Sequence, residues 1–220
     1  MRVVLRVGGS ILRGGDKTLE NLTKGILSLK KKHQVILEVG GGNLSRTYIK
    51  LARRFGVSET KCDYLGIKAS RLNAMLLISL LGEEAYQEVI QDFREIPKAL
   101  ALEKIPVLAG THPGHTNDAV AAMACEFARA DLLLKITDVD GIYDRDPKKF
   151  KNAKKIKKIS FEELESFQNQ NMVAGISSVL DPLASNIIMR SRIKTIVIGE
   201  REMKNLLRVI DGKHSGTLIG

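Results

Sequence analysis

The stretch QVILEVGGGNLSRTYIKLARRF, residues 34–55, decides the fold class of this chain. Four of its first six residues are aliphatic, which predicts a buried strand at 34–39. Three glycines follow, and residues 45–55 then have the mixed apolar and polar spacing of a helix. A buried strand that leads through glycines into a helix is typical of sheets whose strands run parallel.

The same alternation continues along the rest of the chain. Strand-like runs occupy residues 2–7, 105–109, 132–136 and 195–199. Helix-like patterns occupy residues 19–29, 70–81, 120–127, 181–191 and 202–210. Helices between strands imply crossover connections that cover a sheet on both faces. We therefore predict an α/β fold, a three-layer sandwich with a mostly parallel central sheet flanked by helices.

Composition narrows the class of protein. A length of 220 residues fits one domain or two lobes that share a sheet, and 44% hydrophobic with 27% charged residues exclude a disordered chain. The longest apolar stretch, 72–81, is too short to span a bilayer, and the first residues lack the apolar region of a signal peptide. Cys62 and Cys125 have no CxxC partner, which indicates two free, packed thiols. These features predict a cytoplasmic protein without a membrane segment.

The net charge of +10 is concentrated in one segment. Residues 148–158, KKFKNAKKIKK, contain seven lysines, and without them the remaining charge is +3. A lysine run with a single aromatic residue lacks the arginine and aromatic platforms of nucleic-acid-binding proteins. We predict a solvated surface loop, with an anion-attracting rim as the alternative, and no nucleic-acid partner.

Two predicted strands end in glycines. Gly8, Gly9 and Ser10 follow the first strand, and residues 40–42 follow the second, with Arg46 about one turn into the next helix. Glycines after a strand let main-chain N–H groups approach an anion, and a helix N-terminus adds a positive dipole. Either loop alone could be an ordinary turn. Two such loops with an arginine in reach favour a phosphorylated ligand, although GxxxxGK[ST] and GxGxxG motifs are both missing.

A third loop, within AGTHPGHTNDAVAAMACEF at residues 109–127, is unusually rich in functional groups. It carries two histidines and two threonines between a predicted strand and a predicted helix. His112 and His115 have a spacing that metal sites use, but no third ligand is near them in the sequence, so we predict no metal site here. The histidines either hold the loop in shape or contact a ligand directly.

The motifs VGGSIL, VGGGNLSR, GTHPGHTNDAVAA and LLLKITDVDGIYDRDP occur in the order and spacing seen in the amino acid kinase family. The chain resembles this family over essentially its whole length, and GTHPGHT together with CDYLGIKASRLNAMLL resembles its uridylate (UMP) kinase branch, in the archaeal form. The resemblance implies phosphoryl transfer from MgATP to UMP in pyrimidine nucleotide biosynthesis, with Mg²⁺ carried by ATP. It also implies a homo-oligomer, usually a hexamer built from dimers. A phosphotransferase that acts on a carboxylate or carbamate, or a nucleotide-binding regulator without activity, remains an alternative.

The resemblance also implies how the chain divides between its substrates. A single domain, 1–220, has an N-terminal lobe of about 1–130 that binds UMP and a C-terminal lobe of about 131–220 that binds ATP. The implied ATP-binding residues are Gly9, Ser10, Gly42, Arg46, Thr137, Tyr143 and Asp146. The implied UMP-binding residues are Gly41, Asp63, Thr111, His112, Pro113, Gly114, His115, Thr116 and Asn117. The loop that contains THPGHT, residues 111–116, can enclose a nucleobase and its sugar without using charged groups.

Three residues are expected to act in catalysis: Arg6, Arg46 and Asp118. Phosphoryl transfer needs positioning and charge neutralisation more than acid–base chemistry. By resemblance, Asp118 organises the cations around the transferred group, although a carboxylate in the first turn of a helix is also favoured by the helix dipole. Arg6 stands where the family often has lysine, and Asp138 where bacterial relatives have lysine. The neutralising cation is therefore Arg6, Arg46 or Mg²⁺, with Lys135 disfavoured because it lies inside a strand.

Overall fold

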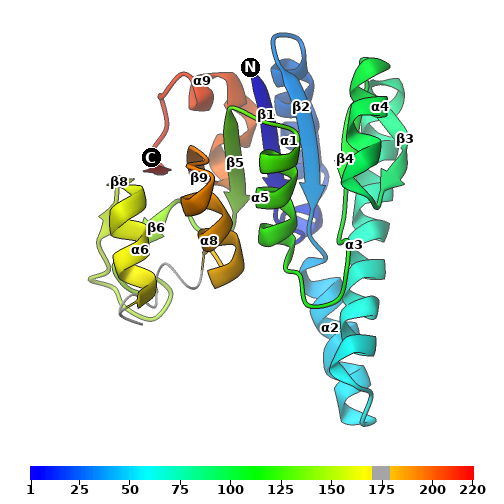
Figure 1. Ribbon diagram of the computed structural model, residues 1–220, viewed down its shortest axis with the longest axis horizontal. Helices are drawn as coiled ribbons and strands as arrows, with labels where there is room; N and C mark the ends of the chain where they lie inside the picture. The colour runs from blue at the N-terminus through cyan, green and yellow to red at the C-terminus, as the bar shows by residue number, and fades with distance from the viewer. Residues whose placement is uncertain (170–178) are drawn as a thin grey trace.

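The computed structural model describes residues 1–169 and 179–220, and within them the main sheet has eight strands (Figure 1). Their spatial order is β3-β4-β2-β1-β5-β9-β10-β8. The first six run parallel, whereas β10 is antiparallel to β9 and parallel to β8. The strands are β1 (Arg2–Val7), β2 (Gln34–Val39), β3 (Ala85–Ile90), β4 (Ile105–Leu108), β5 (Leu132–Thr137), β8 (Lys158–Ile159), β9 (Thr195–Gly199) and β10 (Thr217–Ile219). A separate antiparallel pair consists of β6 (Ile142–Tyr143) and β7 (Lys155–Ile156).

The five strands predicted from continuous apolar runs are the five adjacent strands at the centre of this sheet. Parallel strands that are covered on both faces need apolar residues on both sides, which is why they lack the alternation of half-exposed strands. β3 was not predicted, because it is an edge strand in which Gln87 and Glu88 are exposed. The remaining missed strands have only two or three residues each.

Helices form a layer on each face of the sheet, which confirms the predicted sandwich. α1 (Asp16–Lys30), α3 (Glu59–Leu81) and α9 (Leu206–Ile210) contribute to one hydrophobic cluster. The other cluster contains residues of α4 (Ile96–Ala101), α5 (Asn117–Phe127), α6 (Phe161–Asn169) and α8 (Pro182–Arg190). In Figure 1, α5 and α8 lie in front of the sheet and α1 lies behind it. Every buried strand therefore has apolar partners on both sides.

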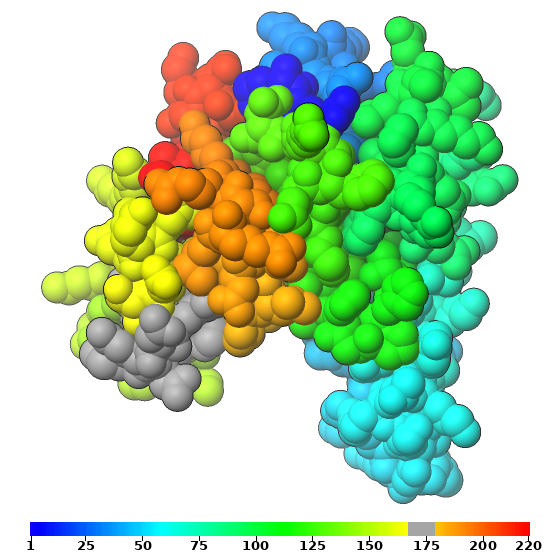
Figure 2. All heavy atoms as spheres, viewed as in Figure 1, coloured from blue at the N-terminus to red at the C-terminus, as the bar shows by residue number. Residues whose placement is uncertain are grey.

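The predicted helices differ from the observed ones mainly at their starts, and α1 and α5 each begin three residues earlier than predicted. α2 spans Gly42–Arg54 and so begins at the third glycine of its loop, before the predicted start at residue 45. α3 spans Glu59–Leu81 and is about twice as long as the predicted 70–81. Its first half was not predicted, because that half packs mainly on α2 and lacks an apolar stripe that faces the core. Figure 2 shows the tip of these two helices projecting beyond the body of the molecule. Residues 202–210 divide into a 3-10 helix, Glu200–Asn205, and the short α9.

The length of α3 changes one inference from composition. The segment Glu59–Glu84 is long and apolar enough to cross a membrane by length and composition, with a mean hydropathy of 1.3. The apolar stretch 72–81 is thus part of a longer helix than the sequence indicated. Leu77, Ile78 and Leu81 nevertheless pack in the core beneath the sheet, as in the core helix of a globular domain.

Both cysteines are buried free thiols, as predicted. Cys62 lies in α3 and Cys125 in α5. Burial raises the pKa of the Cys125 thiol to about 12, so the reactive thiolate form is scarce at neutral pH.

The lysine-rich segment is not simply a solvated loop, which corrects the prediction. It contains β7 and β8, and Lys155 lies 2.8 Å from a carboxylate oxygen of Asp140. Lys148 pairs with Asp138. The backbone of this segment completes sheet edges, while Lys154, Lys157 and Lys158 remain exposed.

Changing Lys154, Lys157 and Lys158, three of the exposed lysines of this segment, together to glutamine should alter solubility and salt dependence while leaving turnover within about threefold, because exposed charges act through screened fields. Lys155 is left unchanged because it pairs with Asp140. Turnover measured between low and moderate salt checks this expectation. A loss of several hundredfold at moderate salt would show that the segment takes part in the reaction.

Candidate functional site

The parallel arrangement brings the predicted functional loops to one edge of the sheet. β2, β1 and β5 are neighbours, β4 pairs with β2, and all four run in the same direction. The segments that follow these strands therefore all leave the sheet at the edge formed by the carboxyl ends of the strands. These segments are residues 8–10, 40–42, 109–116 and 138–146. Ligands of open α/β sheets bind beyond the carboxyl ends of strands in this way.

The two glycine loops touch each other through their main chains. A Cβ atom on Gly9 would lie 2.2 Å from the carbonyl oxygen of Gly40. Gly42 has a φ of +57°, and a Cβ atom there would lie 2.4 Å from the carbonyl carbon of Gly9. Asn73 of α3 donates to the Gly40 carbonyl at 2.8 Å and to that of Gly41 at 3.2 Å. Only glycine permits this approach, and the resulting main-chain surface is fixed.

A row of three charged residues crosses the centre of the sheet next to these loops. Arg6 of β1 is in register with Glu38 of β2 on one side and with Lys135 of β5 on the other. Val4, Ile36 and Leu133, two residues earlier on the same strands, pack in the cluster that contains α5. Since side chains two apart share a face of a strand, the row faces α5. We refer to Glu38, Arg6 and Lys135 as the charged row.

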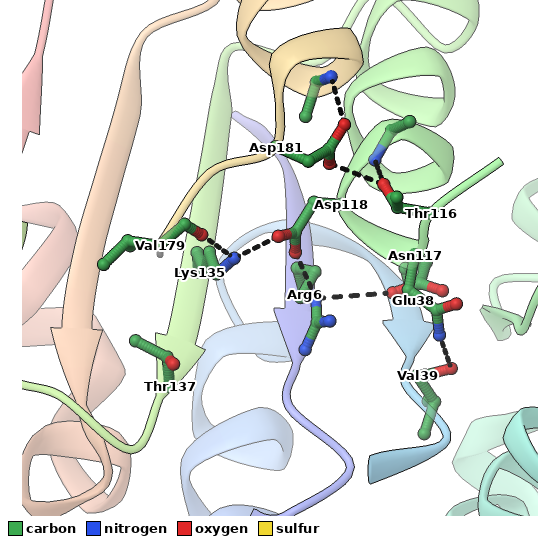
Figure 3. Close-up of polar contacts among 12 residues, drawn as sticks. Arg6, Glu38, Val39, Thr116, Asn117, Asp118, Lys135, Thr137, Val179 and Asp181 are labelled. Atoms are coloured by element: carbon green, nitrogen blue, oxygen red, sulfur yellow. Dashed lines mark hydrogen bonds and ion pairs between the residues drawn. The ribbon is translucent and has the colours of Figure 1, made fainter. Parts of the chain in front are cut away.

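Asp118, in the first turn of α5, connects the two cations of the charged row (Figure 3). The Nε atom of Arg6 lies 2.7 Å from its Oδ1 atom. The Nζ atom of Lys135 donates to its Oδ2 atom and to the carbonyl oxygen of Val179. Burial opposes ionisation of Asp118, but the charges of Arg6 and Lys135 outweigh it and lower the pKa of this carboxyl. Asp118 is therefore an anion that holds two cations.

Lys135 was disfavoured as the neutralising cation because it lies inside a strand. It does lie in β5, near the carboxyl end, but its side chain points to the face covered by α5, where it meets Asp118. Burial lowers the pKa of Lys135, while the charge of Asp118 opposes this shift.

The structure brings Arg6 to the glycine loops. A Cβ atom on Gly8 would lie 3.3 Å from its Nη1 atom, and one on Gly40 would lie 3.2 Å from its Nη2 atom. Burial lowers the pKa of Arg6, but Asp118 and Glu38 outweigh this and raise it, so the guanidinium keeps its charge. A permanent cation therefore borders both loops.

Arg46 lies apart from the charged row. It is exposed on α2, where its Nη2 atom donates to the Oδ1 atom of Asn43. It also borders a surface hollow of about 670 Å³ together with Ile49, Lys50, Arg53 and Arg54. In this arrangement its guanidinium contacts no glycine amide among the described residues.

The third loop is tied to α3 and to itself. Asp63 of α3 accepts a hydrogen bond of 2.8 Å from the main-chain N–H of Gly114. The hydroxyl of Thr111 lies 3.4 Å from Nδ1 of His115, and the rings of His112 and His115 meet edge-on with centroids 6.2 Å apart. Asp63 and the loop 111–117, both predicted to surround UMP, are thus brought together, and His115 helps to hold the loop in shape.

The last two residues of this loop have contacts inside the fold. The Thr116 hydroxyl caps α5 by accepting from Ala119 N–H at 3.0 Å and donates to Asp181 at 2.5 Å. The Asn117 amide donates to the Val39 carbonyl at 3.0 Å. Asp181 in turn caps α8 through hydrogen bonds from Leu183 and Ala184. Both residues hold the start of α5, and hence Asp118, against the charged row.

The residues predicted to surround the adenosine of ATP lie beyond β5. Tyr143 of β6 donates to Asp140 at 2.6 Å, and Asp146 accepts from the main-chain N–H of Lys148 at 2.9 Å. Tyr143 borders a hollow of about 490 Å³, which Thr137 and Asp146 do not line. A larger hollow of about 710 Å³ includes Arg2, Gln34 and Ile105, the first residues of β1, β2 and β4, so it lies at the opposite edge of the sheet.

Sequence reasoning missed Glu38, Asn73 and Asp181. Asn73 and Asp181 left no signal, because their partners are distant in the chain. Glu38 did leave one: the runs RVVLRV, QVILEV and LLLKIT each contain a single interior charge near the carboxyl end. A charge repeated at that place in three buried strands predicts a polar cluster where the strands are neighbours.

Comparisons with known proteins point to one family and one fold. The model of the amino acid kinase family matches residues 1–199. The chain is 48% identical to the uridylate kinase of Pyrococcus abyssi and 44% identical to that of Archaeoglobus fulgidus, over 100% of this chain and 99% and 100% of those proteins. The crystal structure of uridylate kinase from Archaeoglobus fulgidus has a TM-score of 0.88 at 42% identity, with 100% of both chains covered. UMP kinase from Ureaplasma parvum shows the same fold, with a TM-score of 0.82 at 23% identity over 100% of this chain and 98% of that one.

Proposed function

The chain belongs to the amino acid kinase family, and from this premise we propose that it is a uridylate kinase, which transfers the γ-phosphoryl group of ATP to UMP and releases ADP and UDP. The observation that carries the proposal is its similarity, over the full length, to curated proteins of that name. The cation cluster beside two glycine loops supports it independently. The reaction belongs to pyrimidine nucleotide biosynthesis.

The acceptor needs no general base in this reaction. The second pKa of a phosphate monoester is about 6, so the attacking oxygen of UMP is already ionised at neutral pH. The enzyme must instead place donor and acceptor in line and stabilise the charge that develops on the transferred group. Fixed main-chain amides and buried cations supply such stabilisation.

We assign this stabilisation to the cations Arg6 and Arg46, and we assign to Asp118 the role of holding the buried cations in place. Arg6 borders both glycine loops with its guanidinium, and Asp118 fixes that guanidinium through its Nε atom. Lys135 adds a second buried cation on the other carboxylate oxygen. Arg46, which is exposed on α2, would reach the phosphates by swinging away from Asn43.

We propose that the two substrates bind on either side of the glycine loops. The N-terminal lobe, about 1–130, would hold UMP beside Asp63 and the loop 111–117, which are hydrogen-bonded to each other. The C-terminal lobe, about 131–220, would hold the adenosine of ATP near Thr137, Tyr143 and Asp146. The phosphates would meet at the glycine loops through Gly9, Ser10, Gly41 and Gly42.

The residues present fit Mg²⁺ that arrives bound to ATP. Within residues 1–169 and 179–220, no group of three or more histidine, cysteine or acidic side chains is placed to hold a metal ion. Mg²⁺ usually keeps several waters and binds substrate phosphates with few protein ligands. Bound in this way, it would neutralise charge on the phosphates, while Asp118 remains engaged with Arg6 and Lys135.

An exposed apolar stripe on α3 supports the proposed homo-oligomer. Leu72 and Met75 are each 57% exposed, and Leu76 and Leu80 are each 42% exposed. These positions recur at helical spacing on one side of α3, and contiguous apolar surface of this kind marks interfaces. We propose that a second copy of the chain covers this stripe, which makes one dimer of the hexamer built from dimers. The apolar character of α3 then fits a cytoplasmic protein, with one side in the core and the other in the interface.

The proposal predicts selectivity for uracil. The rate of ADP release from MgATP should be at least about tenfold higher with UMP as acceptor than with CMP, AMP or GMP. The reason is that buried polar groups left without a matching partner in a binding site are costly. Uracil offers an N3 donor between two carbonyl acceptors, and cytosine reverses this pattern at positions 3 and 4. A coupled ADP-release assay over the four monophosphates measures this, with acetylglutamate and carbamate as further acceptors. Equal rates with UMP and CMP would contradict uracil recognition by the loop 111–117.

A further inference from the structure

Glu38 is a buried carboxyl group next to the cations of the site, and the proposed mechanism gives it no role. Its exposed fraction is 0%, and its Oε2 atom lies 3.8 Å from Nε of Arg6. Among the described residues, neither carboxylate oxygen has a side-chain hydrogen-bond partner. The same Nε atom forms a closer ion pair with Asp118, whose Oδ1 atom is 2.7 Å away. Two carboxyl groups thus flank one guanidinium nitrogen, and Asp118 holds it.

The charged groups around Glu38 come from several elements. Across β1 and β5, Arg6 and Lys135 are the cations of the same row. From α5, Asp118 is the anion between them, and Asp181 before α8 acts on both cations. On β4, the uncharged Leu108 is in register with Glu38. The main-chain amide of Gly110, two residues later, also acts on the Glu38 carboxyl group. The carbonyl oxygen of Gly110 accepts a hydrogen bond from Arg71 of α3.

We propose that Glu38 is a positioning residue for phosphoryl transfer: as a neutral carboxyl group, it leaves Arg6 bound to Asp118 with the guanidinium tip against the glycine loops. In its ionised form, Glu38 would compete with Asp118 for Nε and cancel one positive charge of the cluster. This inference rests on the proposed uridylate kinase activity. It concerns charge at the edge where anionic phosphates would bind.

The protonation state of Glu38 decides the charge of the cluster. Burial raises the pKa of Glu38 to about 8, although the charge of Arg6 opposes the shift. At pH 7 the carboxyl group of Glu38 is mostly neutral and adds no negative charge to the cluster. At pH 9 Glu38 is mostly ionised, and the cluster loses one unit of positive charge. Inside a protein such a change acts more strongly than in water.

The Glu38→Gln variant tests this inference, because glutamine keeps the shape of the side chain but cannot ionise. In the unmodified enzyme, kcat/KM for UMP at saturating MgATP should fall about tenfold between pH 7 and pH 9, as one group with a pKa near 8 loses its proton. In Glu38→Gln the fall over this range should be less than about threefold. Glu88→Gln, at an exposed glutamate of β3, should follow the unmodified enzyme. The same tenfold fall in Glu38→Gln would overturn the proposal.

Thermal stability provides a readout that does not need activity. A raised pKa means that the stabilising effect of protonated Glu38 is complete below its ordinary pKa of 4.5 and is lost as pH rises through 8. The melting temperature of the unmodified protein should therefore fall, relative to Glu38→Gln, between pH 5 and pH 8.5. Parallel curves would mean that Glu38 ionises in its ordinary range, and the inference would fail. If UMP is not phosphorylated at pH 7, the proposed function fails, and the melting curves still report on Glu38.

Discussion

The Asp118→Asn variant is expected to lose both stability and activity. Asp118 pairs with Arg6 and Lys135, whose side chains are only 15% and 6% exposed. Asparagine would leave these two buried cations without the carboxylate that pairs with both of them. Breaking a buried ion pair by removing one partner costs about 3–5 kcal/mol. For a chain of this size, the melting temperature should fall by about 10 °C.

Turnover should fall further than stability alone explains. Without Asp118, the Nε atom of Arg6 loses its nearest carboxylate, and the ionised form of Glu38 would draw the guanidinium away from the orientation that charge stabilisation needs. Misplacing a single such group typically costs about a hundredfold in kcat. The measurement is kcat with UMP and MgATP at a temperature where the variant remains folded, as calorimetry establishes.

The pH dependence of stability isolates the carboxylate itself. The charges of Arg6 and Lys135 lower the pKa of Asp118, so its stabilising effect is present above the ordinary pKa of 3.8 and is lost as pH falls through the lower pKa of the folded state. The gap in melting temperature between the unmodified protein and Asp118→Asn should therefore narrow in acid.

Asp16→Asn is the matched control for this variant. Asp16 is an exposed aspartate in the first turn of α1, so it has the helix-dipole interaction without buried cations. Removing the charge of Asp16 should lower the free energy of unfolding by no more than about 1 kcal/mol and leave kcat unchanged. If Asp118→Asn behaves like Asp16→Asn, Asp118 serves only the helix dipole, and its organising role is wrong.

The fold could be predicted from the sequence because its central strands are buried on both faces. Such strands appear as continuous apolar runs, and the helices between them require parallel crossovers. β3 was missed because an edge strand has fewer apolar requirements, and its exposed Gln87 and Glu88 break the pattern. The beginning of α3 was missed because it packs on α2 instead of the core. The periodicity of apolar residues in a sequence reflects burial in the core, and both β3 and the beginning of α3 are only partly buried.

The site could be predicted only where one segment contains the signal. The glycine loops and the loop 109–116 are each local, so residue types identified them. The charged row depends on strand order, because Glu38, Arg6 and Lys135 become neighbours only when β2 and β5 flank β1. Spacing along the chain contains no such information. Likewise, Thr116 was expected at UMP, but its hydroxyl bonds with Asp181, 65 residues away.

Arg46→Ala is expected to lower kcat about a hundredfold, the typical value of one cation or donor aimed at developing charge. Arg46 lies four residues after Gly42, which is about one helical turn, so its side chain is long enough to swing back over the glycine loops. Its planar fork can bridge two phosphates, which a lysine ammonium cannot do in the same geometry. Arg46→Lys should therefore recover only part of the lost turnover.

Stability distinguishes this prediction from that for Asp118. Arg46 is exposed and donates to Asn43 on the same helix, so alanine should leave the melting temperature nearly unchanged, because exposed polar contacts contribute little. Arg54→Ala is the matched control, since Arg54 is exposed on the same helix, whereas Arg53 pairs with Glu59. The measurements are kcat, KM for both substrates and melting temperature in all three variants. Near-normal turnover in folded Arg46→Ala would assign charge stabilisation to Arg6, which already borders both glycine loops.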